Sequence, residues 1–317
     1  MKPAPYGPYP FIPINSPKRP KIKWPGNKAI AFWVVLNIEF FPLNEVTPGI
    51  LNERIPRDQA KIPSIAHWSY RDYGNRVGVW RCMEVFKRNK MRSTVMLNAS
   101  MCDHHPEVVH AAKDLDWEFM AHGWTNAVRL NEMPPEQERE TIGRIFARIE
   151  KEIGKRPRGW LSSGMEETWN TLDYLVEQGC VYVSDWNNDD QPYLMNLNGK
   201  QLVSLPYAWE LNDNPQILSS GRSLEEFEAM IRRTFEVLLR EAKQTGSGRV
   251  MCIALHPYLI GQPHRIDMLD RVLHDICGHP DVWPATGGEI VDHYLKSGAT
   301  FETLNLEQGH PRGRHQS

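Results

Sequence analysis

The sequence lacks the features that mark several common classes of protein. It has no run of about 18 apolar residues that could cross a bilayer, and its first residues contain no apolar core of a secretory signal. Lysine and arginine (37) nearly balance aspartate and glutamate (39), so the formal net charge is −2 and there is no basic excess for nucleic acid. We therefore expect a cytoplasmic protein that binds neither nucleic acid nor a membrane.

The five cysteines show no paired spacing. Cys82, Cys102, Cys180, Cys252 and Cys277 are scattered, without a Cys-x-x-Cys motif, so we expect thiols and neither disulfides nor a zinc knuckle. A fixed-period repeat is also absent. With 317 residues, 41% of them hydrophobic, the chain is long enough to bury one large core without covalent cross-links.

The two ends of the chain differ in composition from its middle. Eight of the 24 prolines fall within the first 25 residues, interspersed with aromatic side chains such as Tyr6, Tyr9 and Trp24. This pattern predicts an extended arm over residues 1–28 that packs on the body of the protein or on a neighbouring subunit. The polar residues 301–317 predict a flexible tail. Residues 29–300 remain for a single domain.

Between these ends, short apolar runs alternate with helical patterns. The runs suit strands that are buried on both faces, and they cover residues 29–36, 93–97, 117–121, 181–184, 202–205 and 250–255. Helices are predicted over residues 78–89, 106–113, 135–153, 170–178, 224–238, 266–277 and 288–295. Asn198-Gly199 predicts a two-residue hairpin between residues 193–197 and 201–205. This alternation favours an α/β fold built as a single deformed barrel of seven or eight β/α units.

Four of the predicted strands are followed at once by polar residues that can carry chemistry. They are Glu39, His122, Asp185 and His256. Since parallel strands end at the same rim of a sheet or barrel, we expect all four side chains there. A lone histidine is more often structural, and a carboxylate at a strand end often caps a helix. Four such residues at equivalent positions favour an enzyme instead.

Longer motifs resemble the NodB-type polysaccharide deacetylase superfamily. They are Gly159-Trp160-Leu161 and residues 184–193 and 255–265, with further similarity at residues 71–81 and 206–213. The chain is most similar to the branch that contains cofactor-independent allantoinases, cyclic imide hydrolases and some peptidoglycan deacetylases. The resemblance covers residues 30–295 and implies a deformed β/α barrel whose rim cleaves a carbon–nitrogen bond.

The chain departs from the superfamily pattern at two positions. Typical members carry Asp-Asp after the first strand and His-x-x-x-His after a later one, and three of these four residues bind a divalent metal. Here the corresponding residues are Asn37-Ile38-Glu39 and His122 with Asn126. An asparagine oxygen is a poor zinc ligand beside histidine or thiolate. The preferred prediction is a site without a cofactor; zinc held by Glu39, His122 and Asn126 is the alternative.

A metal-free site requires a protein base and a protein acid. We expect Glu39 to act as general base or to orient water beside His122, and His256 to protonate the departing nitrogen. Asp185 is the fourth catalytic candidate. Asn37 can only position water or substrate, because an amide is not basic near neutral pH.

Further residues are predicted to bind substrate. A guanidinium can hold two oxygens at once, and an aromatic ring can lie against a flat ligand. The candidates are Arg71, Arg76, Arg81, Arg265, Asn126, Trp124, Trp160, Trp186 and Tyr193. Structural ion pairs and core packing are the competing interpretations. The cluster Cys102-Asp103-His104-His105 is expected to precede a helix at Pro106, not to bind a metal.

The expected activity is hydrolysis of a small cyclic amide, imide or ureide, as in allantoinases. The alternatives are a metal-dependent N-deacetylase of an acetylated sugar or peptidoglycan fragment, and an inactive barrel that serves as a binding protein. The expected partner is a small-molecule substrate. The aromatic arm also suggests a homo-oligomer.

Overall fold

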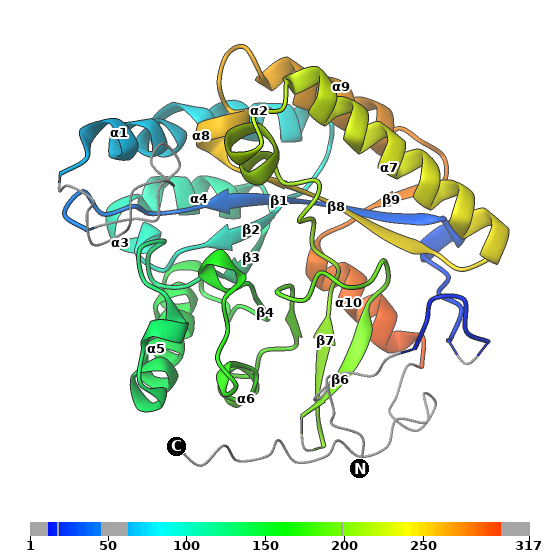
Figure 1. Ribbon diagram of the computed structural model, residues 1–317, viewed down its shortest axis with the longest axis horizontal. Helices are drawn as coiled ribbons and strands as arrows, with labels where there is room; N and C mark the ends of the chain where they lie inside the picture. The colour runs from blue at the N-terminus through cyan, green and yellow to red at the C-terminus, as the bar shows by residue number, and fades with distance from the viewer. Residues whose placement is uncertain (1–11, 18, 46–62, 198, 299–317) are drawn as a thin grey trace.

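One nine-stranded sheet forms the centre of the protein in this computed structural model (Figure 1), which describes residues 12–17, 19–45, 63–197 and 199–298. The strands follow the order β6-β7-β5-β4-β3-β2-β1-β8, and β9 pairs with the beginning of β1. All pairs are parallel except β6 with β7. The strands are β1 (Ile30–Ile38), β2 (Thr94–Leu97), β3 (Glu118–Ala121), β4 (Gly159–Trp160), β5 (Tyr182–Val183), β6 (Tyr193–Leu197), β7 (Lys200–Ser204), β8 (Arg249–Leu255) and β9 (Val282–Pro284).

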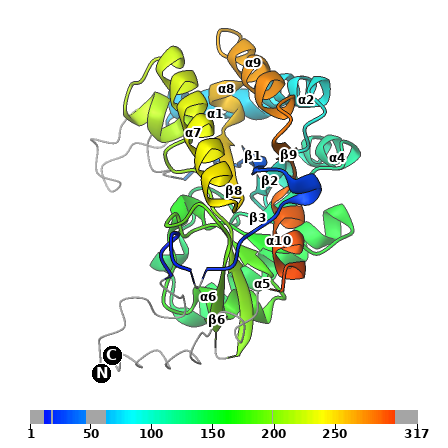
Figure 2. The same ribbon diagram turned by 90° about the vertical axis from the view of Figure 1, so that its right-hand side faces the viewer.

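Helices surround the sheet (Figures 1 and 2). They are α1 (Ile65–Tyr73), α2 (Val79–Arg88), α3 (Met101–His104), α4 (Pro106–Asp114), α5 (Pro135–Ile153), α6 (Thr171–Glu177), α7 (Leu224–Thr245), α8 (Pro257–Ile260), α9 (Ile266–Cys277) and α10 (Gly287–Lys296). A π-helical turn, Gly74–Gly78, joins α1 to α2. None of the helices in the described ranges is long and apolar enough to cross a membrane.

The predicted barrel is confirmed as a curled half-barrel sheet surrounded by helices. Its path begins at β6 and ends at β8, and no strand pairing among the described residues joins these two ends. One local feature lies at each of these two ends of the sheet. The predicted hairpin places Leu197 opposite Lys200, and Asn212 forms an isolated bridge with Ala254 of β8. The sheet therefore stays open on one side.

Every strand predicted from an apolar run is present, and so are the seven predicted helices. The capping box of Ser223 and Glu226 begins α7, and Gly154 ends α5 in the left-handed conformation with φ 77°. Asp103 pairs with Arg148 and the His104 ring stacks on Phe40, so this cluster does not converge on a common ligand.

Part of the predicted arm lies on the body of the protein. Trp24 is buried, donates from its indole nitrogen to the Arg249 carbonyl and contacts Trp283, while Arg19 pairs with Asp189. Residues 1–11, residue 18 and the predicted tail, 301–317, lie outside the described residues.

The concave inner face of the sheet has two distinct ends. At the carboxyl ends of the strands stand Glu39, His122 and His256, directly after β1, β3 and β8. At the amino ends, α10 covers the interior: a Cβ on Gly287 would come within 3.2 Å of the side chains of Trp33 and Tyr182. The open rim is therefore at the carboxyl ends, as predicted for parallel strands.

Candidate active site

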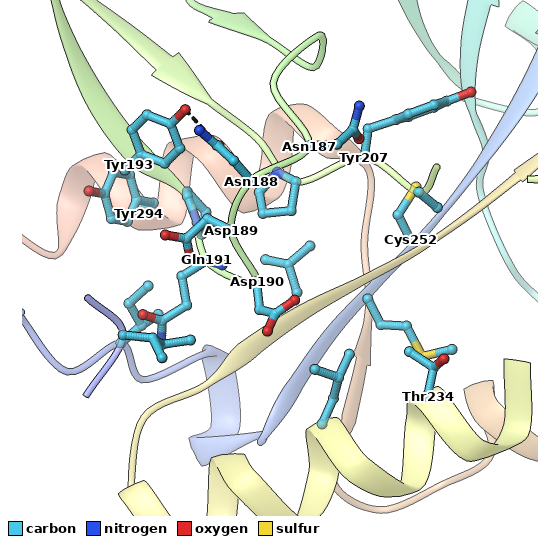
Figure 3. Close-up of a pocket in the computed structure, with 18 of the residues that line it drawn as sticks. Asn187, Asn188, Asp189, Asp190, Gln191, Tyr193, Tyr207, Thr234, Cys252 and Tyr294 are labelled. Atoms are coloured by element: carbon cyan, nitrogen blue, oxygen red, sulfur yellow. Dashed lines mark hydrogen bonds between the residues drawn. The ribbon is translucent and has the colours of Figure 1, made fainter. Parts of the chain in front are cut away.

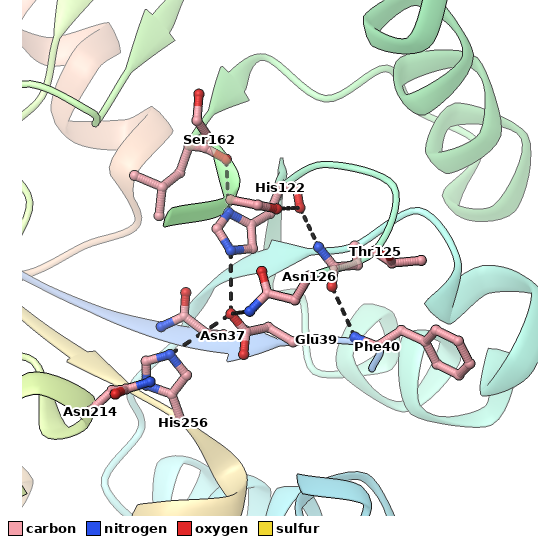
Figure 4. A network of polar contacts seen from close by, with 12 residues as sticks. Asn37, Glu39, Phe40, His122, Thr125, Asn126, Ser162, Asn214 and His256 are labelled. Atoms are coloured by element: carbon pink, nitrogen blue, oxygen red, sulfur yellow. Dashed lines mark hydrogen bonds and ion pairs between the residues drawn. The ribbon is translucent and has the colours of Figure 1, made fainter. Parts of the chain in front are cut away.

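Glu39, His122 and His256 meet at the carboxyl-end rim (Figure 4). Glu39 Oε1 lies 3.4 Å from His122 Nε2 and 3.8 Å from His256 Nε2. The three residues are 6%, 3% and 5% exposed, respectively, so each is nearly enclosed but keeps some accessible surface. The sequence predicted this convergence from the position of each residue after a parallel strand.

Local backbone interactions hold Glu39 and His122 in place. The Asn75 amide, from the π-helical turn, donates to the Glu39 carbonyl at 2.9 Å. Gly123 follows His122 with φ 74°, and a Cβ there would stand 2.5 Å from Ser163 Oγ. Glycine is therefore required for the turn that brings Asn126 back to Glu39.

His256 is fixed by the buried carboxylate of Asp213, for which the strand-end patterns of the sequence indicate no role. Asp213 Oδ1 lies 2.7 Å from His256 Nδ1, and Asp213 Oδ2 accepts from the His256 backbone N–H at 2.9 Å. Nδ1 must donate to the carboxylate, which leaves Nε2 directed at Glu39. Burial lowers the pKa of His256, but Asp213 and Glu39 outweigh it, and the net shift is upward.

The Glu39 carboxylate experiences the opposite balance. Burial raises its pKa, but the charge of His256, the interactions with His122 and the charge of Arg71 together lower it below the ordinary value. Glu39 is therefore held as an anion between two imidazoles.

His122 also has a fixed orientation. Its Nδ1 lies 2.8 Å from the Leu161 carbonyl, which can only accept, so Nδ1 carries the proton and Nε2 points to Glu39. Asp185 does not reach this imidazole directly. Its carboxylate accepts from the Ser162 N–H at 2.8 Å and from the Ser162 hydroxyl at 3.2 Å. Burial raises the pKa of Asp185 to about 6, against opposing hydrogen bonds from Glu167 and Ser162.

Two acceptor atoms at the site have no hydrogen-bond partner within the described part of the chain. Asn126 Nδ2 donates to Glu39 Oε1 at 2.9 Å, whereas Asn126 Oδ1 and Glu39 Oε2 are both buried and unpaired. A buried acceptor without a donor costs about 1–3 kcal/mol. A bound molecule with N–H or O–H donors would relieve this cost.

The predicted binding residues separate into different environments. Arg71 is buried, lies over the Phe41 ring at 4.3 Å and interacts electrostatically with Glu39. Asn37 is also buried beside the site, but its amide donates to the Leu255 carbonyl and thereby joins β1 to β8. Asn37 therefore has a structural contact that the sequence did not indicate.

The other predicted arginines have protein partners. Arg76 is exposed and pairs with Asp72, and Arg81 donates to the Gly261 carbonyl at 2.9 Å and to Tyr73. Arg265 donates to the Leu259 carbonyl at 3.4 Å and interacts electrostatically with Asp213, on the far side of His256 from Glu39. Of the four arginines, these contacts bring only Arg71 towards Glu39.

The predicted aromatic walls do not form one surface. Trp160 points outward from β4 and stacks on Phe146 of α5 at 5.8 Å, so it lies in the core. Trp124 carries the Arg144 guanidinium over its ring, and Trp186 packs partly against the core. Tyr193 bonds to Asn188 and lines a separate pocket of about 700 Å³, between β8, the β6–β7 hairpin and the arm (Figure 3). This pocket is not the Glu39 site.

The structure adds residues that strand-end patterns could not indicate. Asp213 and Ser162 are the clearest, because each contacts a predicted catalytic side chain from a segment that is not itself a strand end with an apolar run. The available signal for Asp213 was its place in the stretch 206–213, which resembles the superfamily. The Leu161–Ser162 peptide follows the motif Gly159-Trp160-Leu161, which also resembles the superfamily, but nothing in that motif indicated a role for Ser162.

A curled parallel sheet whose carboxyl-end rim holds an anionic carboxylate between two fixed imidazoles defines an α/β-barrel enzyme with a hydrolytic type of site. Comparisons with known proteins agree. Residues 69–183 match the family model described as "Polysaccharide deacetylase". These matches confirm the resemblance to the NodB-like polysaccharide deacetylase superfamily that the motifs predicted.

Individual relatives cover most of the chain. The solved structure of Puue allantoinase is 26% identical, covers 89% of this chain and 95% of its own, and has a TM-score of 0.79. A "probable Polysaccharide deacetylase" from Pseudomonas aeruginosa PAO1 is 28% identical, covers 89% and 96%, and has a TM-score of 0.78. A Schizosaccharomyces pombe protein named "Putative polysaccharide deacetylase" is 28% identical over 84% of this chain and 90% of its own.

Members of this family typically depend on a divalent metal, but the donor atoms here do not fit a tightly held zinc ion. The position of the second metal histidine holds Asn126, which directs its amide nitrogen towards Glu39 and not its oxygen. Within residues 12–17, 19–45, 63–197 and 199–298, no group of three His, Cys, Asp or Glu side chains could hold a metal.

Proposed function

We propose that the protein hydrolyses a carbon–nitrogen bond in a small cyclic amide, imide or ureide, as an allantoinase does. The observation that carries this proposal is the anionic Glu39 between His122 and His256. Glu39 Oε2 and Asn126 Oδ1 lie beside it without a hydrogen-bond partner among the described residues. Two adjacent acceptors suit a substrate or water that presents two donors, and a cyclic ureide carries several N–H groups. The similarity to Puue allantoinase supports the same class of substrate.

The proposed reaction uses this chain's own residues. Glu39 orients a water molecule and accepts its proton, which can pass to His122 Nε2, 3.4 Å away. The water oxygen bonds to the carbonyl carbon, and His256, whose raised pKa favours the protonated form, gives its proton to nitrogen as the carbon–nitrogen bond breaks. Transfer of the water proton to His256 then restores the site. Arg71, which interacts electrostatically with Glu39, is the candidate cation for the developing oxyanion.

The direct test is product release from a panel of hydantoins, imides, ureides and N-acetyl sugars, measured for the wild type and Glu39→Gln by mass spectrometry. Ring opening by the wild type alone is the expected result. Acetate release from an N-acetyl sugar would instead favour the deacetylase alternative, and binding without turnover on the whole panel would favour a binding protein.

The cofactor proposal has its own measurement. We propose that turnover requires no metal, since Asn126 replaces a strong ligand. Elemental analysis and activity before and after a chelator test this. Stoichiometric zinc whose removal abolishes turnover would contradict it.

Location and assembly complete the proposal. All five cysteines are free thiols, which fits a reducing cytoplasm. A homo-oligomer stays a prediction, for sedimentation velocity to test.

A further inference from the structure

The two imidazoles that face Glu39 are supported by carboxylates in different ways. His256 is bonded directly to Asp213 at 2.7 Å. His122 is bonded to a carbonyl oxygen, that of Leu161, at 2.8 Å. The same peptide group continues as the Ser162 N–H, and this N–H donates to Asp185 at 2.8 Å. One peptide unit therefore joins His122 to a carboxylate.

We propose that Asp185 is a positioning residue that acts on His122 through the Leu161–Ser162 peptide, and so keeps a proton on His122 Nδ1 and Nε2 directed at Glu39. This inference deepens the proposed hydrolytic function and rests on it for its kinetic consequences. Its structural part, the choice of tautomer, is independent of any substrate.

The physical basis is polarisation of a peptide between an anion and a donor. A carboxylate at the N–H end increases the negative charge on the carbonyl oxygen, and hydrogen bonds in such a chain strengthen one another. A stronger acceptor at Leu161 favours Nδ1–H over Nε2–H in His122. For histidines that bind metals, loss of such an outer partner costs about 10–100-fold in metal affinity or activity, and we expect a dependence of the same kind for His122.

The surrounding contacts leave this peptide little freedom to choose another partner. The Leu161 N–H donates to the Ala121 carbonyl at 3.1 Å, which ties it to β3 just before His122. Ser163 Oγ donates to the His122 carbonyl at 3.0 Å. The Trp160 indole donates to Ser162 Oγ at 2.9 Å, so this hydroxyl is directed at Asp185 Oδ2. Three neighbouring strand ends, those of β3, β4 and β5, thus form one connected unit.

The decisive variant is Asp185→Asn, which keeps the shape and an acceptor for the Ser162 N–H but removes the charge. We expect kcat to fall about 10-fold with KM nearly unchanged. In ¹⁵N spectra, His122, assigned by its loss in His122→Gln, should change from one tautomer to a mixture. Ser162→Ala separates the two contacts of this residue, because it removes the hydroxyl that contacts Asp185 and the Trp160 indole but keeps the Ser162 N–H. His122 should keep the wild-type tautomer in this variant.

Two results would overturn the inference. One is a folded Asp185→Asn protein in which His122 keeps the Nδ1–H tautomer. The other is a Ser162→Ala protein in which His122 loses the Nδ1–H tautomer as far as it does in Asp185→Asn, because the hydroxyl would then be the important contact. If the wild-type protein hydrolyses nothing, the proposed function fails. The tautomer measurement still decides whether Asp185 acts on His122 through the Leu161–Ser162 peptide, which we call the relay.

A second perturbation covers the case in which Asp185→Asn does not fold. Replacing Ser162 by its α-hydroxy acid turns the amide into an ester, which deletes the N–H and leaves every side chain in place. The same shift of His122 towards mixed tautomers is expected, and an unchanged spectrum would reject the relay.

Discussion

Two buried carboxylates, those of Glu39 and Glu118, lie near opposite ends of strand β3. His122, just past its carboxyl end, faces Glu39, whereas Glu118 begins the strand about 13 Å away. Glu118 accepts from the Tyr182 hydroxyl and the Gly288 N–H, both at 2.7 Å, and from the Thr94 hydroxyl at 3.3 Å. As a residue it is partly exposed, but these donors enclose its carboxylate.

The two glutamates show that the partners of a carboxylate, and not enclosure alone, decide its charge. Burial raises the pKa of both side chains. At Glu39 the charge of His256, the contact with His122 and the charge of Arg71 reverse this effect. At Glu118 neutral hydroxyl and backbone donors only reduce it, and the pKa stays raised. We infer that Glu39 serves the reaction and that Glu118 anchors the start of α10.

The largest expected effect separates the two residues by activity. Glu39→Gln should lower kcat about 1000-fold, because an amide can neither accept the water proton nor stabilise the charge of protonated His256. Glu118→Gln, the matched control, should stay within about twofold of wild type, since it changes the same group far from the reacting atoms. Steady-state kinetics on the substrate found by the panel checks both. Equal losses of kcat in the two variants would show that Glu39 has no special role in the reaction.

The next effect separates them by stability. Glu118→Ala leaves the Tyr182 hydroxyl and the Gly288 N–H without their acceptor, at an expected cost of about 2–4 kcal/mol in the free energy of unfolding. Urea denaturation followed by circular dichroism measures it. The turnover rate per folded molecule should equal that of the wild type. If the free energy of unfolding of Glu118→Ala also equals that of the wild type, α10 does not depend on Glu118.

The same contrast explains what the sequence could predict. Apolar runs fix where β1, β3 and β8 end, so they place Glu39, His122 and His256 at one rim. The two-residue strand β4 has no such run, and the face that Trp160 occupies depends on the packing of α5 against it. Asp213 was missed because its place beside His256 arises from the long-range Asn212–Ala254 bridge.

A smaller effect concerns the acid at the site. Asp213 helps to raise the pKa of His256, and the proposed role requires His256 protonated, so the rate should fall as pH rises through that pKa. Asp213→Asn should move this fall to lower pH and reduce kcat about 10-fold at neutral pH. The pH profile of kcat/KM checks it, with Asp275→Asn at the half-exposed Arg232 pair as control. An unmoved basic limb would contradict the assignment.

The smallest effect is the difference in how the two glutamates couple stability to pH. The lowered pKa of Glu39 means that the unfolded chain binds its proton more readily, so this contribution is present above the ordinary glutamate pKa and is lost as pH falls through the folded value. The raised pKa of Glu118 has the reverse sign: stability falls as pH rises from the ordinary value through the folded one. Urea titrations of wild type, Glu39→Gln and Glu118→Gln between pH 3.5 and 7 isolate each term by difference. We expect the Glu39 contribution to the free energy of unfolding to rise with pH below the ordinary glutamate pKa, and the Glu118 contribution to fall with pH above it. Contributions that change with pH in the same direction would mean that burial, and not the charge of the partners, governs both carboxylates.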